Sequence, residues 1–170
     1  SAIQQADYII HLAGAGVADK RWSDARKKEI ADSRINSCAL IVKALSSIPN
    51  KVKGVISASA IGWYGPDNQL DDEGNASTGL DKRGFTEAAN PYPDFLGNTC
   101  KAWEDSITPV KAFGKRLVIL RTGIVLSNQG GALVEFKKPL LFKTAAILGS
   151  GKQMISWIHV DDLCNQYIYA

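Results

Sequence analysis

Residues 7–16, DYIIHLAGAG, contain a nearly continuous apolar run (YIIHL, 8–12) that ends in small residues. Strands covered by helices on both faces have this composition. Two further runs are rich in β-forming residues: VKGVIS at 52–57 and LVILR at 117–121. A small or flexible residue follows each run, so the sequence predicts three short strands that end in turns.

Helical patterns occupy the intervals between these strands. Ser23 is placed to cap a helix over residues 24–46, in which apolar side chains recur at a spacing near 3.6. A second helix is predicted over residues 95–112, with a kink at Pro109. Strands that alternate with helices are the signature of a parallel α/β sheet with right-handed crossovers.

The rest of the chain is less regular. We expect a helix over 131–142, a strand near 155–158 and a helix from about Asp161. The segment 65–94, between the second strand and the second helix, is rich in Gly, Pro, Asp and Asn. A segment of this length is either a mobile surface loop or a lid over a substrate, and the sequence leaves both readings open. The length of 170 residues predicts one domain over 1–170.

Composition excludes several classes of protein. Apolar residues make up 45% and charged residues 22%, as in ordinary globular proteins. The net charge of +3 is too small to indicate nucleic acid, and the basic stretch 20–28 contains Asp24 and is flanked by Asp19 and Glu29. No apolar run is long enough to cross a membrane. Three scattered cysteines and two histidines favour a reducing cytoplasm and no metal site.

Ligands of a parallel α/β sheet bind beyond the carboxyl ends of its strands, so the residues at those ends are the candidates for a site. The small residues LAGAG at 12–16 either let a ligand approach the backbone or only let helix and strand pack closely. The hydroxyls of SASAIGWYG, 57–65, either donate to a substrate or cap the turn. Neither a GxGxxG phosphate loop nor a GxSxG nucleophile elbow is present.

Taken in order, six motifs resemble a known family. They are DYIIHLAGAG, SRINSCALIVKAL, VISASAIGWYG, FTEAANPYPDFLGNTCKAWE, RLVILRTGIVL and SWIHVDDL. They are similar to the extended short-chain dehydrogenase/reductases, in particular to the atypical epimerase-like branch of the NAD-dependent epimerase/dehydratase family. The resemblance implies a Rossmann-like parallel sheet with flanking helices. Because HLAG follows the fourth strand of that fold, it also implies an incomplete doubly wound domain without the glycine-rich pyrophosphate loop.

The resemblance implies a nicotinamide cofactor, NADP in preference to NAD. The positions that it assigns to cofactor binding are Leu12, Ala13, Gly14, Glu29, Arg34, Ser57 and Val125. An exposed salt bridge on the helix is the other interpretation of Glu29 and Arg34.

The catalytic residues of the family are only partly matched. The family uses a Tyr and a Lys four residues apart, in which the Lys lowers the pKa of the Tyr. Aligned on Glu104, these positions hold Leu96 and Cys100. The remaining candidates for proton transfer are Ser59 and Tyr64, with Tyr92 as an alternative. Cys100 is expected to be a buried, inert thiol.

Two functions therefore stay open. The first is an NAD(P)-dependent epimerase or oxidoreductase-like protein that acts on a nucleotide sugar or a small hydroxyl- or carbonyl-bearing substrate. The second is a non-catalytic NADP-binding or sensor protein without the Tyr/Lys pair. Either would bind a small molecule rather than nucleic acid or a membrane. An apolar sheet edge at residues 8–12 predicts self-association into a homo-oligomer.

Overall fold

The computed structural model describes residues 2–66, 85–144, 151 and 155–170. The chain groups into two compact units, the first made of residues 1–65 and 87–121 and the second of 66–86 and 122–170. Most of the predicted loop, residues 67–84, lies outside the described residues. The choice between a surface loop and a lid, and the single domain over 1–170, stay predictions.

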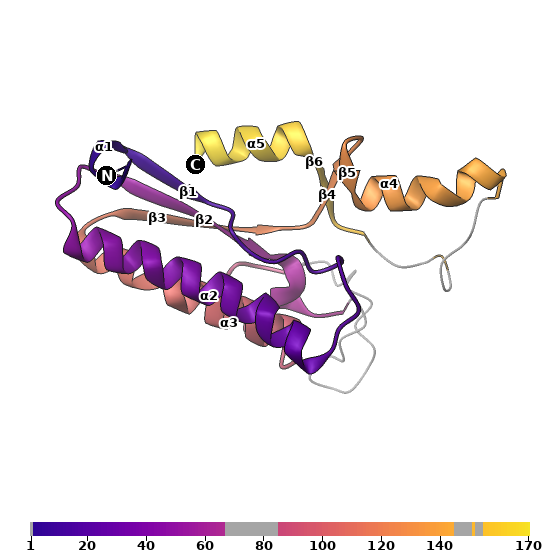
Figure 1. Cartoon of the computed structure of the whole chain (residues 1–170), viewed down its shortest axis with the longest axis horizontal. Helices are drawn as coiled ribbons and strands as arrows, with labels where there is room; N and C mark the ends of the chain where they lie inside the picture. Colours follow the sequence, from indigo (N-terminus) through magenta and orange to yellow (C-terminus); the bar gives the residue numbers. More distant parts are fainter. Residues whose placement is uncertain (1, 67–84, 145–150, 152–154) are drawn as a thin grey trace. The chain divides into compact units, whose positions relative to one another are not determined.

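The first unit contains a three-stranded sheet. Its order is β1 (Tyr8–His11), β2 (Gly54–Ala60) and β3 (Arg116–Thr122). Strands β1 and β2 pair in parallel, and the three arrows run in the same direction in Figure 1. The predicted parallel sheet is confirmed. The predicted limits of the second strand are wrong, because β2 continues to Ala60 and so contains both Ser57 and Ser59.

Two long helices lie side by side along one face of this sheet (Figure 1). They are α2 (Asp24–Ser47) and α3 (Phe95–Ile107). Each begins after a residue whose side chain accepts from a backbone N–H of the first turn: Ser23 from Arg26 and Asp94 from Gly97. These caps explain why both helices start where the sequence predicts them.

Short helical turns complete the first unit. They are α1 (Ala2–Gln5), η1 (Ile61–Tyr64) and η2 (Thr108–Phe113). The sequence predicts that the second long helix continues to residue 112 with a kink, but α3 ends at Ile107 and η2 begins at the next residue. Pro109 has no N–H to donate to the preceding turn, and the chain tightens into a 3₁₀ turn there. Gly114, at φ 67°, then turns the chain into β3.

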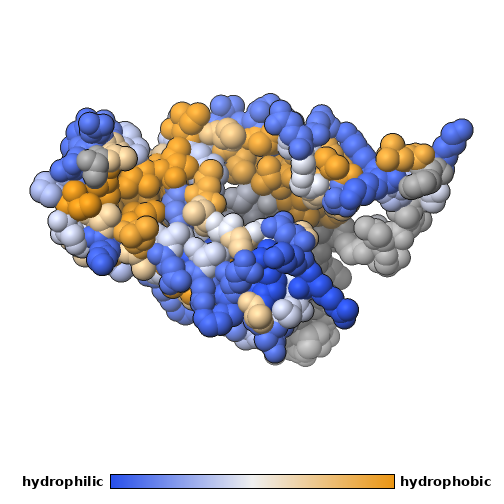
Figure 2. Space-filling view, viewed as in Figure 1, coloured by the Kyte–Doolittle hydropathy of each residue, from blue (hydrophilic) through white to orange (hydrophobic). Residues whose placement is uncertain are grey.

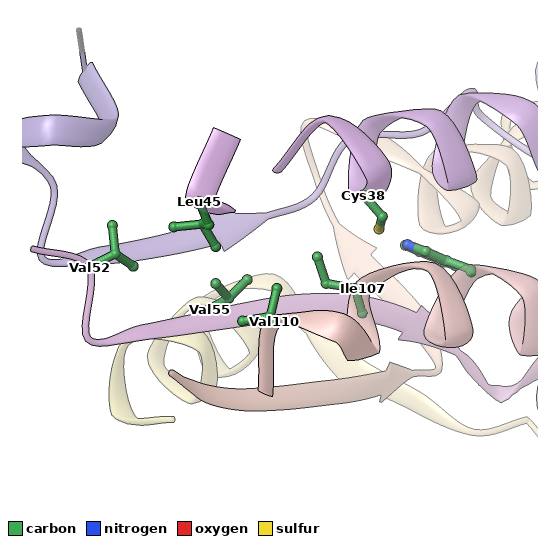
Figure 3. Close-up of a cluster of buried hydrophobic side chains, with 7 residues drawn as sticks. Cys38, Leu45, Val52, Val55, Ile107 and Val110 are labelled. Carbon is green, nitrogen blue, oxygen red and sulfur yellow. The ribbon is translucent and has the colours of Figure 1, made fainter. Parts of the chain in front are cut away.

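The core of the first unit lies between the two helices and β2. It consists of Cys38, Leu45, Val52, Val55, Trp103, Ile107 and Val110. Figure 3 shows the labelled side chains of α2 pointing toward those of β2, α3 and η2. Burial is uneven along β1, where Tyr8 is 56% and Ile10 47% exposed. Figure 2 shows hydrophobic residues gathered over β1 and β2 and hydrophilic ones over the amino-terminal half of α2.

The second unit has a small sheet of order β5-β4-β6. Strand β4 (Ile124–Ser127) pairs antiparallel with β5 (Gly130–Gly131) and parallel with β6 (Trp157–His159). Neither β4 nor β5 was predicted. Gly123 separates β3 from β4, and a Cβ there would lie 2.6 Å from the carbonyl oxygen of Ser156. Residues 116–127 therefore form two strands, β3 and β4, which belong to different sheets.

The helices of the second unit follow the predicted order. The helix expected over 131–142 is present as α4 (Ala132–Lys137) and the 3₁₀ turn η3 (Lys138–Phe142). The last helix, α5 (Val160–Tyr169), begins one residue earlier than expected. Among the described residues, the structure contains no helix with the length and apolar character needed to cross a membrane.

Candidate functional site

His11 ends β1 and lies buried between β1, β2 and α2. Its Nε2 is 2.9 Å from Ser37 Oγ, and its Nδ1 is 3.4 Å from Ser57 Oγ and 3.6 Å from Cys38 Sγ. We call these four residues the His11 cluster. Burial lowers the pKa of His11, so the neutral imidazole is favoured. Ser57 is fully buried here and donates to its neighbour Ala58, so a contact of Ser57 with a cofactor stays a prediction.

The backbone just beyond β1 is exposed and lies against α2. Leu12, Ala13 and Gly14 are all exposed, Leu12 by 60%. Arg34 of α2 donates from Nη1 to the carbonyl oxygen of Ala15 at 3.0 Å. A Cβ on Gly14 would lie only 3.1 Å from the Arg34 side chain. The structure therefore brings four of the predicted cofactor positions together: residues 12–14 and Arg34.

Glu29 does not join that group. Its carboxylate is exposed and pairs with Arg26, with 2.7 Å between Nη1 and Oε2. The hydrogen bond from Arg26 lowers the pKa of Glu29. Arg26 also donates to the carbonyl oxygen of Gly16, so this pair holds the loop after β1 to the start of α2. A cofactor contact of Glu29 stays a prediction.

A second polar cluster lies where β2 and β3 end. Arg121, near the end of β3, forms a two-pronged ion pair with Glu104 of α3, with Nε–Oε1 at 2.8 Å and Nη2–Oε2 at 3.0 Å. Ser59, near the end of β2, donates to Glu104 Oε1 at 2.6 Å. Trp63 and Tyr64 of η1 cover the guanidinium. We call these five residues the Arg121 cluster.

The Arg121 cluster is closed to solvent on most sides. The side chains of Arg121 and Glu104 are 14% and 12% exposed, and Ser59 is 3% exposed. The guanidinium carbon lies 3.6 Å from the centroid of the Trp63 ring, a cation–π contact. The hydrogen bonds that Arg121 donates to Glu104 raise the pKa of Arg121, so the guanidinium remains charged. Both catalytic candidates contact this ion pair, because Arg121 Nη1 donates to the Tyr64 hydroxyl at 3.1 Å.

Leu96 and Cys100 face the same strand end. Cys100 Sγ donates to the carbonyl oxygen of Ala60 at 3.6 Å, and Gly62 lies against Leu96 and Cys100. Burial raises the pKa of the Cys100 thiol, as expected for an inert cysteine. Lys101 points elsewhere and pairs with Asp105 in solvent. Leu96 and Cys100, which the alignment on Glu104 matches to the family's Tyr and Lys, thus lie beside this strand end as an apolar side chain and a buried thiol.

Two further predictions from the sequence concern Val125 and a metal site. Val125 lies in β4 of the second unit, half-buried and paired with Ile158. Among the described residues, no group of three His, Cys, Asp or Glu side chains is placed to hold a metal ion. Sequence reasoning did not identify Glu104 and Arg121 as site residues. The available signal was a charged residue at the end of an apolar strand, where a buried cation needs a partner.

The model of the NAD dependent epimerase/dehydratase family matches residues 1–92. The chain belongs to this family. An epimerase family protein of Staphylococcus saprophyticus is 36% identical over 169 residues, which are 99% of this chain and 52% of that protein. The chain thus spans about half the length of this curated relative.

Solved structures agree with this family. The nucleoside-diphosphate sugar epimerase of Corynebacterium glutamicum is 31% identical, with a TM-score of 0.73 over 97% of this chain and 31% of that one. A human epimerase family protein, solved with NADPH, is 25% identical, with a TM-score of 0.75 over 93% of this chain and 50% of that one. The predicted family and the Rossmann-like fold are therefore confirmed.

Proposed function

We propose that this chain is the part of an NAD(P)-dependent, epimerase- or oxidoreductase-like protein that places polar groups at a small substrate. The substrate is a nucleotide sugar or another small molecule with a hydroxyl or carbonyl group. The Arg121 cluster carries this proposal, because it lies where β2 and β3 of a parallel sheet end, the place at which such sheets bind ligands. The nucleoside-diphosphate sugar epimerase among the relatives supports the substrate class.

The end of β1 is the proposed cofactor contact. Leu12, Ala13 and Gly14 leave the backbone exposed, and Arg34 places a cation beside it. These features fit an anionic dinucleotide that lies along the strand ends. We propose NADP as the preferred cofactor and NAD as the weaker one, supported by the NADPH in the human relative. A bound nicotinamide would supply hydride transfer.

Tyr64 and Ser59 are the proposed catalytic groups. The Tyr64 hydroxyl accepts a hydrogen bond from Arg121, which fixes the place of its oxygen beside the ion pair. The Ser59 hydroxyl donates to Glu104, and its oxygen retains the capacity to accept a hydrogen bond from a substrate. Of the two, Tyr64 is the better proton donor or acceptor, because Ser59 is nearly fully buried.

A specific observation favours the second function, a non-catalytic NADP-binding protein. In the alignment on Glu104, Leu96 and Cys100 stand at the positions of the family's Tyr and Lys, and both side chains lie beside Gly62. Such a protein would bind the cofactor through residues 12–14 and Arg34 and leave the Arg121 cluster as a structural element.

Cofactor binding is tested by titrating the chain with NADPH and following tryptophan fluorescence, with NADH as the control. Saturable binding at about micromolar concentration, tighter for NADPH, supports the proposal. Arg34→Gln should weaken this binding, whereas Lys43→Gln, exposed on the same helix, should not. No saturable binding of either nucleotide contradicts both functions.

Turnover separates the two functions. The chain with NADPH is incubated with a panel of nucleotide sugars and small carbonyl compounds, and NADPH oxidation and the appearance of an epimer by NMR are recorded. Conversion that Tyr64→Phe reduces by about a hundredfold or more, without loss of NADPH binding, supports the enzyme. Tight NADPH binding without conversion across the whole panel supports the non-catalytic protein.

A further inference from the structure

Arg121 contacts more of the site than its partner Glu104. Besides the two bonds to that carboxylate, its Nη1 donates to the Tyr64 hydroxyl and to the backbone carbonyl of Glu87, both at 3.1 Å. The face of the guanidinium lies on Trp63. One side chain thus bonds to α3, to η1 and to the segment that precedes α3.

The two segments held by Arg121 are also bonded to each other. Trp63 Nε1 donates to the carbonyl oxygen of Ala89 at 2.8 Å, and the N–H of Tyr92 donates to the carbonyl oxygen of Trp63 at 2.7 Å. Tyr92 then packs against Gly65 and Gly97, where a Cβ would overlap it. Residues 61–65 and 87–92 therefore form one layer over the end of β2, with Trp63 at its centre.

The shape of the guanidinium decides which residue can do this. Its planar fork matches the two oxygens of Glu104 and leaves one nitrogen for Tyr64 and Glu87. A lysine at this position has a single nitrogen and no flat face to stack on Trp63. A largely buried ion pair also contributes little net stability compared with apolar packing, so stability alone does not account for it.

We infer that Arg121 is a positioning residue: held by Glu104, it sets the place of the Tyr64 hydroxyl and joins the 61–65 turn to the 87–92 segment. This inference rests on the proposed function only for the use to which Tyr64 is put. The placement itself is a property of the chain without cofactor or substrate.

The test follows the Trp63 indole N–H in ¹H–¹⁵N spectra of the ligand-free chain. Its signal among the four tryptophans is assigned with Trp63→Phe. In Arg121→Ala, we expect this signal to shift and the protection of the proton against exchange to fall by about tenfold or more, since a charged hydrogen-bond network is lost. Arg116→Ala removes an exposed arginine from the same strand and should leave the signal unchanged.

Rescue separates positioning from general loss of folding. Guanidinium ion at millimolar concentration should restore the Trp63 signal of Arg121→Ala, whereas methylammonium should not. Arg121→Lys keeps the charge and should show the same shift and the same fall in protection, and it carries the test if the alanine variant does not fold. The inference is overturned if the Trp63 signal is unchanged in Arg121→Ala. It is also overturned if Arg121→Lys keeps the signal and the exchange protection of the unmodified chain.

The proposed function and the positioning role of Arg121 can fail independently. If the unmodified chain does not bind NADPH, the proposed function is contradicted, but the result of the Trp63 measurement still stands. If the chain converts a substrate of the panel, Arg121→Lys should lower kcat more than it raises KM, because Tyr64 is displaced while the substrate contacts remain. A rise in KM alone would overturn the positioning role.

Discussion

The His11 cluster and the Arg121 cluster join a strand end to a helix in different ways. His11 connects β1 to α2 through neutral groups, the hydroxyl of Ser37 and the thiol of Cys38. Arg121 connects β3 to α3 through opposite charges that are also hydrogen-bonded to Ser59 and Tyr64. Burial disfavours the charged imidazole but leaves the paired guanidinium charged. The neutral cluster should therefore respond to pH and the charged one to removal of a partner.

The largest expected effect comes from breaking the charged pair. Glu104→Ala leaves Arg121 without its carboxylate and Ser59 without its acceptor, and should lower the free energy of unfolding by about 3 kcal/mol. Urea denaturation measures this loss. Asp105→Ala removes the neighbouring carboxylate of the same helix, which is exposed and paired with Lys101, and should change stability little. If the two variants lose the same free energy of unfolding, the buried pair of Arg121 and Glu104 contributes no more to stability than an exposed pair.

The next effect tests the layer that covers the Arg121 cluster. A methyl group on Gly97 would overlap the carbonyl oxygen of Tyr92, so Gly97→Ala must displace the 87–92 segment. We expect a loss of about 2 kcal/mol in urea denaturation, although Ala in a helix otherwise gains about 1 kcal/mol over Gly. Gly130→Ala is the control, because a Cβ there meets nothing within 4 Å. A more stable Gly97→Ala would contradict the close approach of Tyr92.

The smallest effect is the pH dependence of the neutral cluster. Burial lowers the pKa of His11 below 6.5, so around that pH the unfolded chain binds a proton that the folded chain does not. The contribution of neutral, buried His11 to the free energy of unfolding is complete above about pH 6.5. It falls as the pH is lowered through 6.5, by at most about 1.4 kcal/mol per pH unit. The raised pKa of Arg121 implies no such change between about pH 5 and 9.

His11→Gln should remove this part of the slope. The measurement is the difference in unfolding free energy between the unmodified chain and His11→Gln, taken from urea curves between about pH 5 and 7. The subtraction cancels carboxylates that titrate in both proteins. If the unfolding free energies of the two proteins change in parallel with pH, the pKa of His11 is the same in the folded and unfolded chain. That result would contradict the lowered pKa expected from burial.

Much of the first unit could be predicted from local sequence signals. The caps at Ser23 and Asp94 lie directly before the helices that they start. The order of strands and helices follows from their different hydrophobic periods. The limits of β2 could not be read in this way, since SASA at 57–60 has neither bulky nor strongly β-forming side chains. Pairing with β1 stops at Ser57, opposite His11, and the neighbour of β2 on its other side is β3, so the extra residues depend on contacts that no local pattern encodes.

The candidate site divides in the same way. Ser59 and Tyr64 were identified from the sequence because they follow a predicted strand, and Leu12, Ala13 and Gly14 because they match strand-end positions of the family that the chain resembles. Glu104 served only to align the chain with the family. Its partner Arg121 is 17 residues away, a separation to which no helical or strand periodicity applies.

The sequence by itself determined the family and the succession of strands and helices in the first unit, and it aligns Leu96 and Cys100 with the family's Tyr and Lys. These properties depend on residue types at fixed local spacings. Only the tertiary structure decided that Ser59 donates to Glu104, that Glu29 pairs with Arg26, and that Arg121 holds Tyr64. The partners of Glu104 and Arg121 come from segments far apart in the chain, so the bonds form only once strand register and helix rotation have brought those side chains together.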